Sequence, residues 1–146
     1  MYDWLLEYAH DDEIYTLPET DDAAIEDALG LFDGRLTFYC SLSDNADESC
    51  LWCVGEPDRR LIEGRLVERD EVRHFILRRR HGGGGDAGPV RHGIRPADAV
   101  EAAPSEIFTA AEALAIFLAF YHHKEIPSDC ESVPTSRLFG ANSFED

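Results

Sequence analysis

The chain has 146 residues and a formal net charge of −17, from 30 acidic residues against 13 Lys and Arg. This length suits a single domain over residues 1–146, and the 44% of hydrophobic residues argues against a fully disordered chain. The strong negative charge disfavours general binding to nucleic acid or to an anionic membrane, so we expect neither a membrane protein nor a direct nucleic-acid binder.

The first third of the chain is predicted to form a strand, a helix and a second strand. Residues 2–8 are rich in aromatic side chains, which indicates an opening strand. Thr20 is typical of a helix N-cap, two aspartates follow it in the positive first turn, and apolar residues keep helical spacing as far as Phe32. Alternation of apolar and polar residues then indicates a strand over residues 36–40.

Short strands separated by polar turns dominate the middle of the chain. Residues 50–54, 61–68 and 72–80 are predicted strands, and their short connections are typical of an antiparallel meander. Residues 81–89 are rich in glycine and predict a flexible loop. A further short strand is expected over residues 90–95, and the pattern of the next residues leaves their structure open.

The last predicted helix spans Thr109–Lys124. Thr109 and Glu112 have the spacing of a capping box, and the helix is apolar around most of its circumference, which indicates deep packing. Residues 128–146 are expected to form a tail that packs on the domain. Together these elements predict an α+β fold, with an antiparallel sheet of about five or six strands packed by this C-terminal helix and by the N-terminal helix at residues 20–32.

The spacing of the four cysteines identifies neither a disulfide framework nor a metal or redox site. Met1-Tyr2-Asp3-Trp4 lacks the start of a signal peptide, so we expect a cytoplasmic protein in which disulfides are not the default. Cys50 and Cys53 form a C-x-x-C motif, but on a strand residues three apart point to opposite faces. A zinc site needs a second ligand pair, and His122-His123 would point about 100° apart on a helix. Buried apolar cysteines are favoured over a redox or metal site, and we expect no cofactor.

No catalytic motif stands out, and we expect that the protein is not an enzyme. The glycine run at residues 82–85 lacks the Lys-Ser/Thr that follows the glycines of a phosphate-binding loop. No nucleophile elbow of the G-x-S-x-G type is present. The acidic runs at residues 11–13 and 44–48 are possible divalent-cation ligands, although the second lacks the glycine and distal Glu of an EF-hand loop. No regular spacing links the histidines, which are His10, His74, His81, His92, His122 and His123.

Acidic residues are concentrated at the start of the chain, where residues 1–58 hold 16 carboxylates and a single base, Arg35. In predicted loops, such carboxylates can imitate a phosphate backbone and attract a basic partner. Solubility alone explains them equally well, and both interpretations stay open. Exposed aromatic residues would anchor the partner, and at least two of the candidates Tyr2, Trp4, Tyr15 and Tyr39 are expected in the core. The predicted partner-binding residues are Asp11, Asp12, Glu13, Tyr15, Asp21, Asp22, Asp44, Asp47 and Glu48.

An Arg-rich segment over residues 78–95 supports an alternative function. Arg78-Arg79-Arg80-His81, followed by glycines and by Arg91 and Arg95, has the composition of a nucleic-acid-binding segment. The alternative is therefore a small adaptor or regulatory domain that binds a protein or RNA through this segment. The overall charge favours a simpler interpretation, in which these arginines form a solvated strand end that pairs with the acidic first part of the chain, and a local RNA contact stays open.

The stretch from Phe108 to Pro127, FTAAEALAIFLAFYHHKEIP, is a capped apolar helix that runs into a turn and a proline. It resembles the final helix of the immunity proteins of bacterial polymorphic toxin systems, in particular of the first-numbered immunity family. The glycine-rich loop after residues 72–80 is similar in placement. This resemblance implies a small cytoplasmic α+β protein without catalytic residues. It also implies a cognate toxin partner with a basic, nucleic-acid-acting domain of the nuclease or deaminase class, whose active site the protein occludes.

Overall fold

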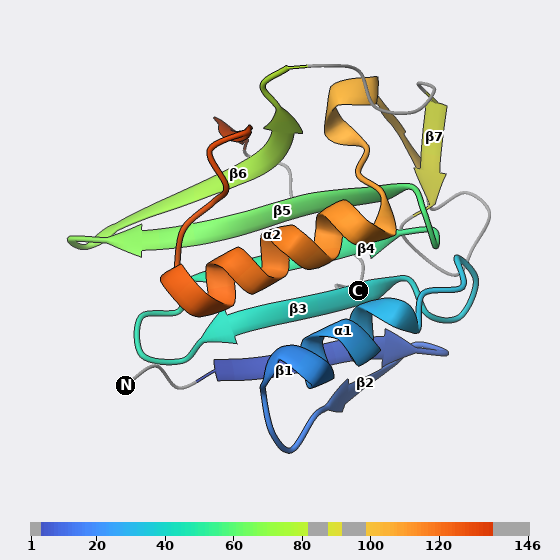
Figure 1. The fold of residues 1–146 in the computed structure, drawn as a ribbon, viewed down its shortest axis with the longest axis horizontal. Helices are drawn as coiled ribbons and strands as arrows, with labels where there is room; N and C mark the ends of the chain where they lie inside the picture. Colours follow the sequence, from blue (N-terminus) through green and yellow to red (C-terminus); the bar gives the residue numbers. More distant parts are fainter. Residues whose placement is uncertain (1–3, 82–87, 92–98, 136–146) are drawn as a thin grey trace.

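The computed structural model describes residues 4–81, 88–91 and 99–135. Within these ranges the chain forms nine strands, two α-helices and one short 3₁₀ helix. Figure 1 shows their order, which is β1 (Trp4–His10), β2 (Glu13–Thr16), α1 (Asp22–Gly30), β3 (Tyr39–Asp44), β4 (Cys50–Gly55), β5 (Arg60–Glu68), β6 (Glu71–Arg79), β7 (Gly88–Arg91), β8 (Ala99–Ala102), the 3₁₀ helix (Pro104–Glu106), α2 (Ala110–His123) and β9 (Cys130–Pro134).

The α+β fold class is confirmed. Seven strands form one antiparallel sheet in the order β2-β1-β3-β4-β5-β6-β9, and β7 and β8 form a separate two-stranded sheet. The main sheet is larger than the predicted five or six strands because two elements were not foreseen. Residues 13–16 form β2, and residues 130–134, which were predicted to be part of a tail, form the edge strand β9. Gly88 and Pro89, which were expected in the glycine-rich loop, instead begin β7, where they pair with β8. Residues 82–87 of that segment, residues 92–95 of an expected strand and the remaining tail residues 136–146 lie outside the described residues.

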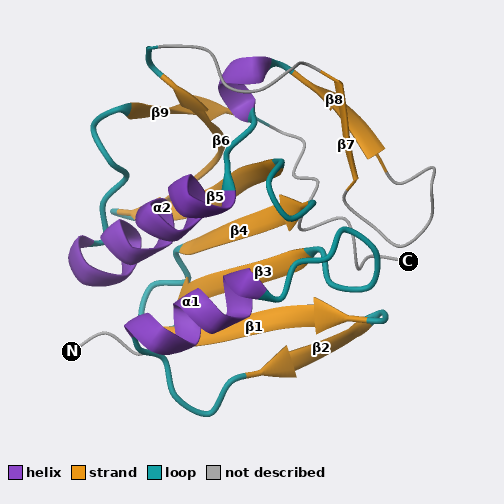
Figure 2. Cartoon of the chain, turned by 45° about the vertical axis from the view of Figure 1, so that its right-hand side comes forward, coloured by secondary structure: helices purple, strands orange, loops and turns teal. Residues whose placement is uncertain are grey.

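Each helix begins at a side-chain cap. α1 begins one residue later than expected, because the carboxylate of Asp21, rather than Thr20, accepts a hydrogen bond from the Ala24 amide. The predicted capping box of α2 is confirmed, since the Thr109 hydroxyl accepts from the Glu112 amide at 3.2 Å and a Glu112 carboxylate oxygen accepts from the Thr109 amide at 2.9 Å. Both helices cover the same face of the main sheet (Figure 2).

The sheet separates two apolar clusters. Side chains of α1 and α2 pack with Leu51 and Cys53 of β4 on the helix-covered face. Cys50 and Trp52, which alternate with them along β4, belong to the second cluster, where they pack with Val90 of β7 and other residues. The predicted divergence of the Cys50 and Cys53 thiols is therefore confirmed, and it follows from the two-residue period of a strand.

Two hairpins of the main sheet have the same tight turn. β1 and β2 are joined by Asp11-Asp12, with φ of 51° and 67°, and β5 and β6 by Arg69-Asp70, with φ of 47° and 69°. Two successive residues with positive φ are typical of a type I′ turn, whose twist matches that of the flanking strands. Aspartate tolerates this conformation, so the acidic run at residues 11–13 turns the chain from β1 into β2, a strand that was not predicted.

Candidate interaction surface

Carboxylates gather along the β1–β2 side of the molecule. Residues 4–31 contain nine Asp and Glu and no Lys or Arg. β2 forms the edge of the main sheet, and α1 lies across β1 beside it (Figure 2). We call the exposed carboxylates of this region, together with β2, the acidic edge; these carboxylates are Asp11, Asp12, Glu13, Glu19, Asp21, Asp22, Glu26 and Asp27.

The acidic edge extends along the length of β1. Asp11, Asp12 and Glu13 lie at the hairpin end of the strand. Asp21 and Asp22 lie at its opposite end, because the neighbouring Thr20 hydroxyl donates a hydrogen bond to the carbonyl of Trp4. Seven residues of strand place the two groups about 20 Å apart. A surface of this length suits a macromolecular partner.

β2 brings apolar and aromatic surface into the acidic edge. All four of its residues are exposed, and Ile14 and Tyr15 keep 49% and 41% of their accessible surface. The Tyr15 ring stacks on Tyr8 at 5.4 Å between centroids, and its hydroxyl donates to Glu13 at 2.9 Å. This hydrogen bond and the Glu13 charge raise the pKa of Tyr15. Tyr15 is therefore held in place as an exposed platform, and its role as an anchor stays a prediction.

The three remaining acidic candidates have a different environment, in the turn between β3 and β4. Asp44 is fully buried, and its carboxylate accepts a hydrogen bond from the Lys124 Nζ at 2.6 Å. Asp47 also pairs with Lys124. Burial acts to raise the pKa of Asp47, but Lys124 and the Ser49 amide outweigh it, so this pKa lies below its usual range. Glu48 has an exposed side chain, while its carbonyl accepts from Arg65. Asp44 and Asp47 thus tie the turn to the end of α2, and we leave both out of the acidic edge.

Two of the four aromatic candidates pack into the fold, Trp4 partly buried and Tyr39 buried. The Trp4 ring packs edge-on against Phe120 at 5.4 Å, and Tyr39 is buried, which raises its pKa. Tyr2 lies outside the described residues. Tyr15 therefore remains as the exposed aromatic candidate in the part of the chain that the structure describes.

The arginines at residues 78–80 are engaged within the fold. Arg78 and Arg80 both pair with Glu131 of β9, and Arg80 also donates to the Cys130 carbonyl at 3.0 Å. Arg79 binds both carboxylate oxygens of Glu112 on α2. Residues 92–98, which include Arg95, lie outside the described residues. Arg78, Arg79 and Arg80 therefore stabilise the contact of β6 with β9 and α2, and their carboxylate partners Glu112 and Glu131 lie outside the acidic first part of the chain.

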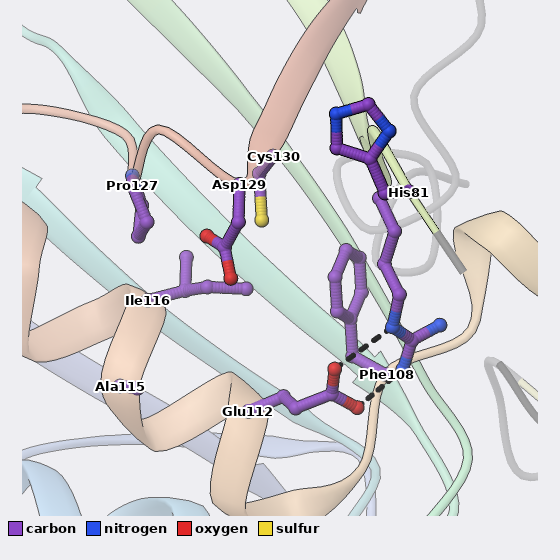
Figure 3. Close-up of a pocket in the computed structure, with 9 residues that line it drawn as sticks. His81, Phe108, Glu112, Ala115, Ile116, Pro127, Asp129 and Cys130 are labelled. Atoms are coloured by element: carbon purple, nitrogen blue, oxygen red, sulfur yellow. Dashed lines mark hydrogen bonds and ion pairs between the residues drawn. The ribbon is translucent and has the colours of Figure 1, made fainter. Parts of the chain in front are cut away.

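A pocket of about 220 Å³ lies beside the Arg79–Glu112 pair (Figure 3). Arg79 is also bonded to the carbonyls of Pro104 and Ile107, so its guanidinium has protein partners on several sides. Burial raises the pKa of the Cys130 thiol to about 11, which leaves it protonated and weakly nucleophilic at neutral pH. Cys130 is therefore no candidate nucleophile in this pocket. Sequence reasoning missed the pocket because its lining comes from distant segments, namely Arg79, His81, Phe108, Glu112, Ala115, Ile116, Pro127, Asp129 and Cys130.

Neither a cluster of metal ligands nor a membrane-spanning helix occurs among the described residues. No group of three His, Cys, Asp or Glu side chains in this part of the chain is arranged to hold a metal ion. All four cysteines are free and buried, and burial raises the pKa of Cys53 to about 12. In the same ranges, none of the helices combines the length and apolar character needed to cross a membrane.

Comparison of the chain with protein-family models finds no matching family, and comparison with curated proteins finds no match.

Proposed function

We propose that this protein is a binding protein that occludes a basic partner with its acidic edge, in the way that an immunity protein neutralises a nuclease or deaminase toxin. The observation that carries the proposal is the acidic edge itself, a row of exposed carboxylates with no Lys or Arg in residues 4–31. Such a surface accelerates association with a positively charged domain and disfavours acidic competitors.

The composition of β2 supports a specific interface beyond charge attraction. Interfaces draw much of their binding energy from a few aromatic and apolar anchors at the centre, surrounded by polar groups that exclude water. Ile14 and Tyr15 are exposed on β2, and Asp11, Asp12 and Glu13 lie directly beside them. The arrangement therefore combines apolar anchors with an acidic surround.

The environment of the arginines favours this proposal over the adaptor alternative. Arg79 is 13% exposed and paired with Glu112 of α2, whereas Arg78 and Arg80 are about half exposed and share Glu131 of β9 at the surface. Binding of RNA or a protein through Arg79 would first have to break its pair with Glu112, and the Glu131 charge lowers the positive potential at Arg78 and Arg80. Within the acidic edge, Asp21 caps α1, Asp22 lies 2.8 Å from the His122 ring nitrogen and Glu13 accepts from Tyr15.

The test is capture of the partner by tagged protein, from the cells that express it, followed by an assay of the partner's activity on nucleic acid. The charge variant is Asp11→Asn/Asp12→Asn/Glu13→Lys, in which asparagine retains the positive φ of the turn. The β5–β6 turn offers a matched control, Glu68→Gln/Asp70→Asn/Glu71→Lys, with the same change in net charge in the same turn type.

We expect the unmodified protein and the β5–β6 control to retain one stoichiometric partner and to inhibit it. The charge variant should lose both properties. Equal capture and inhibition by the two variants would contradict the role of the acidic edge. Recovery of RNA that is lost in Arg78→Gln/Arg80→Gln would instead establish the adaptor function.

A further inference from the structure

We propose that β2 binds its partner by strand addition, so that a basic, extended segment of the partner becomes the next strand of the main sheet. This inference rests on the proposed function and specifies how the acidic edge engages its partner. The occupant is a strand in which basic and apolar residues alternate.

The first support is the outward backbone of β2. In a two-residue hairpin, His10 and Glu13 form the first hydrogen-bonded pair, and such pairs then alternate along an antiparallel ladder. The Leu17 amide donates to the Leu6 carbonyl at 3.0 Å, which agrees with this alternation. The N–H and C=O groups of Ile14 and Thr16 therefore point away from β1. No other strand of the described chain pairs with this side of β2.

The second support is the side chains that would flank an added strand. Tyr15 is paired with Tyr8 on the helix-covered face, and Glu13 lies on that same face two residues away. Ile14 points to the opposite face, where the Thr16 hydroxyl donates to Glu7 at 3.1 Å. Each face of the edge thus offers one apolar surface and one carboxylate. Basic side chains beside the carboxylates and apolar ones beside Ile14 and Tyr15 complement both faces.

Charge also disfavours a second copy of this chain as the natural occupant. Pairing of β2 with β2 of another molecule would bring two acidic edges together, each without Lys or Arg in residues 4–31. Like charges that face each other across strands are destabilising. A basic strand gains from the same carboxylates, and exposed edges are a general template for such addition.

The experiment uses two short peptides with equal charge, one alternating Lys and Val and one alternating Lys and Pro. The Lys-Pro peptide keeps the charge but cannot form a regular strand. Affinity is measured for the unmodified protein and for Ile14→Pro, which removes one outward N–H at an edge position where proline is tolerated. Val72→Pro is the matched control. Val72 directly follows the hydrogen-bonded pair Glu68–Glu71 of the β5–β6 hairpin, just as Ile14 follows the pair His10–Glu13. Its side chain is similarly exposed, at 56%.

We expect the Lys-Val peptide to bind, to slow hydrogen exchange at the Ile14 and Thr16 amides, and to bind about tenfold more weakly to Ile14→Pro, since a strand hydrogen bond is lost. Val72→Pro should bind normally. A different result would be equal affinity for both peptides that Ile14→Pro leaves unchanged and the Asp11→Asn/Asp12→Asn/Glu13→Lys variant abolishes. That result would overturn strand addition and leave the proposed function standing. Binding that is insensitive to that charge variant would count against the proposed function itself. A dimer that Ile14→Pro abolishes would overturn the choice of a basic partner strand.

Discussion

Replacing Lys124 by Met tests whether one ammonium group holds the β3–β4 turn against the end of α2. The Lys124 Nζ lies 2.6 Å from the Asp44 carboxylate, and the two side chains are 18% and 0% exposed. Removal of one partner from a buried ion pair costs about 3–5 kcal/mol, because the other charge stays buried without compensation. Asp47 keeps 33% of its side chain exposed and can be rehydrated. We therefore expect a loss near the lower limit, about 3 kcal/mol, or about 10 °C in Tm for a chain of this size.

Urea unfolding followed by circular dichroism gives the free energy directly, provided that the m-value is unchanged. The control addresses the backbone, because Lys124 ends α2 with a φ of 54°. Lys124→Gly loses the same ammonium but relieves the left-handed conformation, so it should be about 1 kcal/mol more stable than Lys124→Met. The double variant Asp44→Asn/Lys124→Met should recover part of the loss. A change below about 0.5 kcal/mol in Lys124→Met, or strict additivity in the double variant, would refute the argument.

The same ion pairs predict a pH dependence whose sign follows from the two pKa shifts. Burial acts to lower the pKa of Lys124, but Asp44 and Asp47 outweigh it and raise this pKa above 10.5. Its contribution to stability is therefore complete below pH 10.5 and is lost as the pH rises through the folded-state pKa. Asp47 has a pKa below 3.8, so its contribution is present above that pH and is lost as the pH falls further. The difference between the unmodified protein and Lys124→Met should shrink at both extremes.

Three further predictions concern the interior. Gly64→Ala should cost about 2–3 kcal/mol in urea unfolding, because the added Cβ would lie 2.7 Å from the Cys50 carbonyl oxygen; a neutral effect would show that the strands shift freely. Arg79→Met should cost about 2 kcal/mol by the same assay, since it removes the ion pair with Glu112 and the hydrogen bonds to the carbonyls of Pro104 and Ile107. An unchanged midpoint would assign these bonds no net role. An alkylating reagent at pH 8 should label no cysteine in native protein and all four in denaturant, because burial raises their pKa values, that of Cys53 to about 12; rapid native labelling would contradict the described core.

Elements determined by neighbouring residues were predictable from the sequence. The capping box of α2 needs only Thr109 and Glu112, three residues apart, and the apolar residues after it indicate burial without knowledge of the partner surface. Strand alternation likewise separated Cys50 from Cys53 correctly. These properties depend on local geometry, which the order of residues contains directly.

Elements determined by distant residues were not predictable. β9 is a five-residue strand, and its identity depends on pairing with β6, some fifty residues earlier in the chain. β2 was missed because acidic residues usually end a strand, whereas here Asp11 and Asp12 form the turn of a hairpin. In the candidate site, charge patterning identified the exposed acids of the β1–β2 turn. It placed Asp44 with them because nothing near Asp44 in the sequence reveals its pairing with Lys124.

Strand β4 has a consequence for how the sheet finds its alignment. All six of its residues are buried, and both of its faces are apolar. A slip by one residue would therefore move Cys50, Trp52 and Val54 to the face that Leu51 and Cys53 now occupy, at little cost in buried apolar surface. The usual contrast between a polar and an apolar face therefore cannot select the register of this strand. The space available to side chains can select this register. Leu51 is paired with Gly64, and a methyl group at Gly64 would lie 2.6 Å from the Phe75 ring. If β4 slipped by one residue, Trp52 or Cys50 would replace Leu51 opposite Gly64, and its side chain would be directed toward the crowded region around that glycine. The alignment of the central strands thus depends on the position at which a side chain is missing.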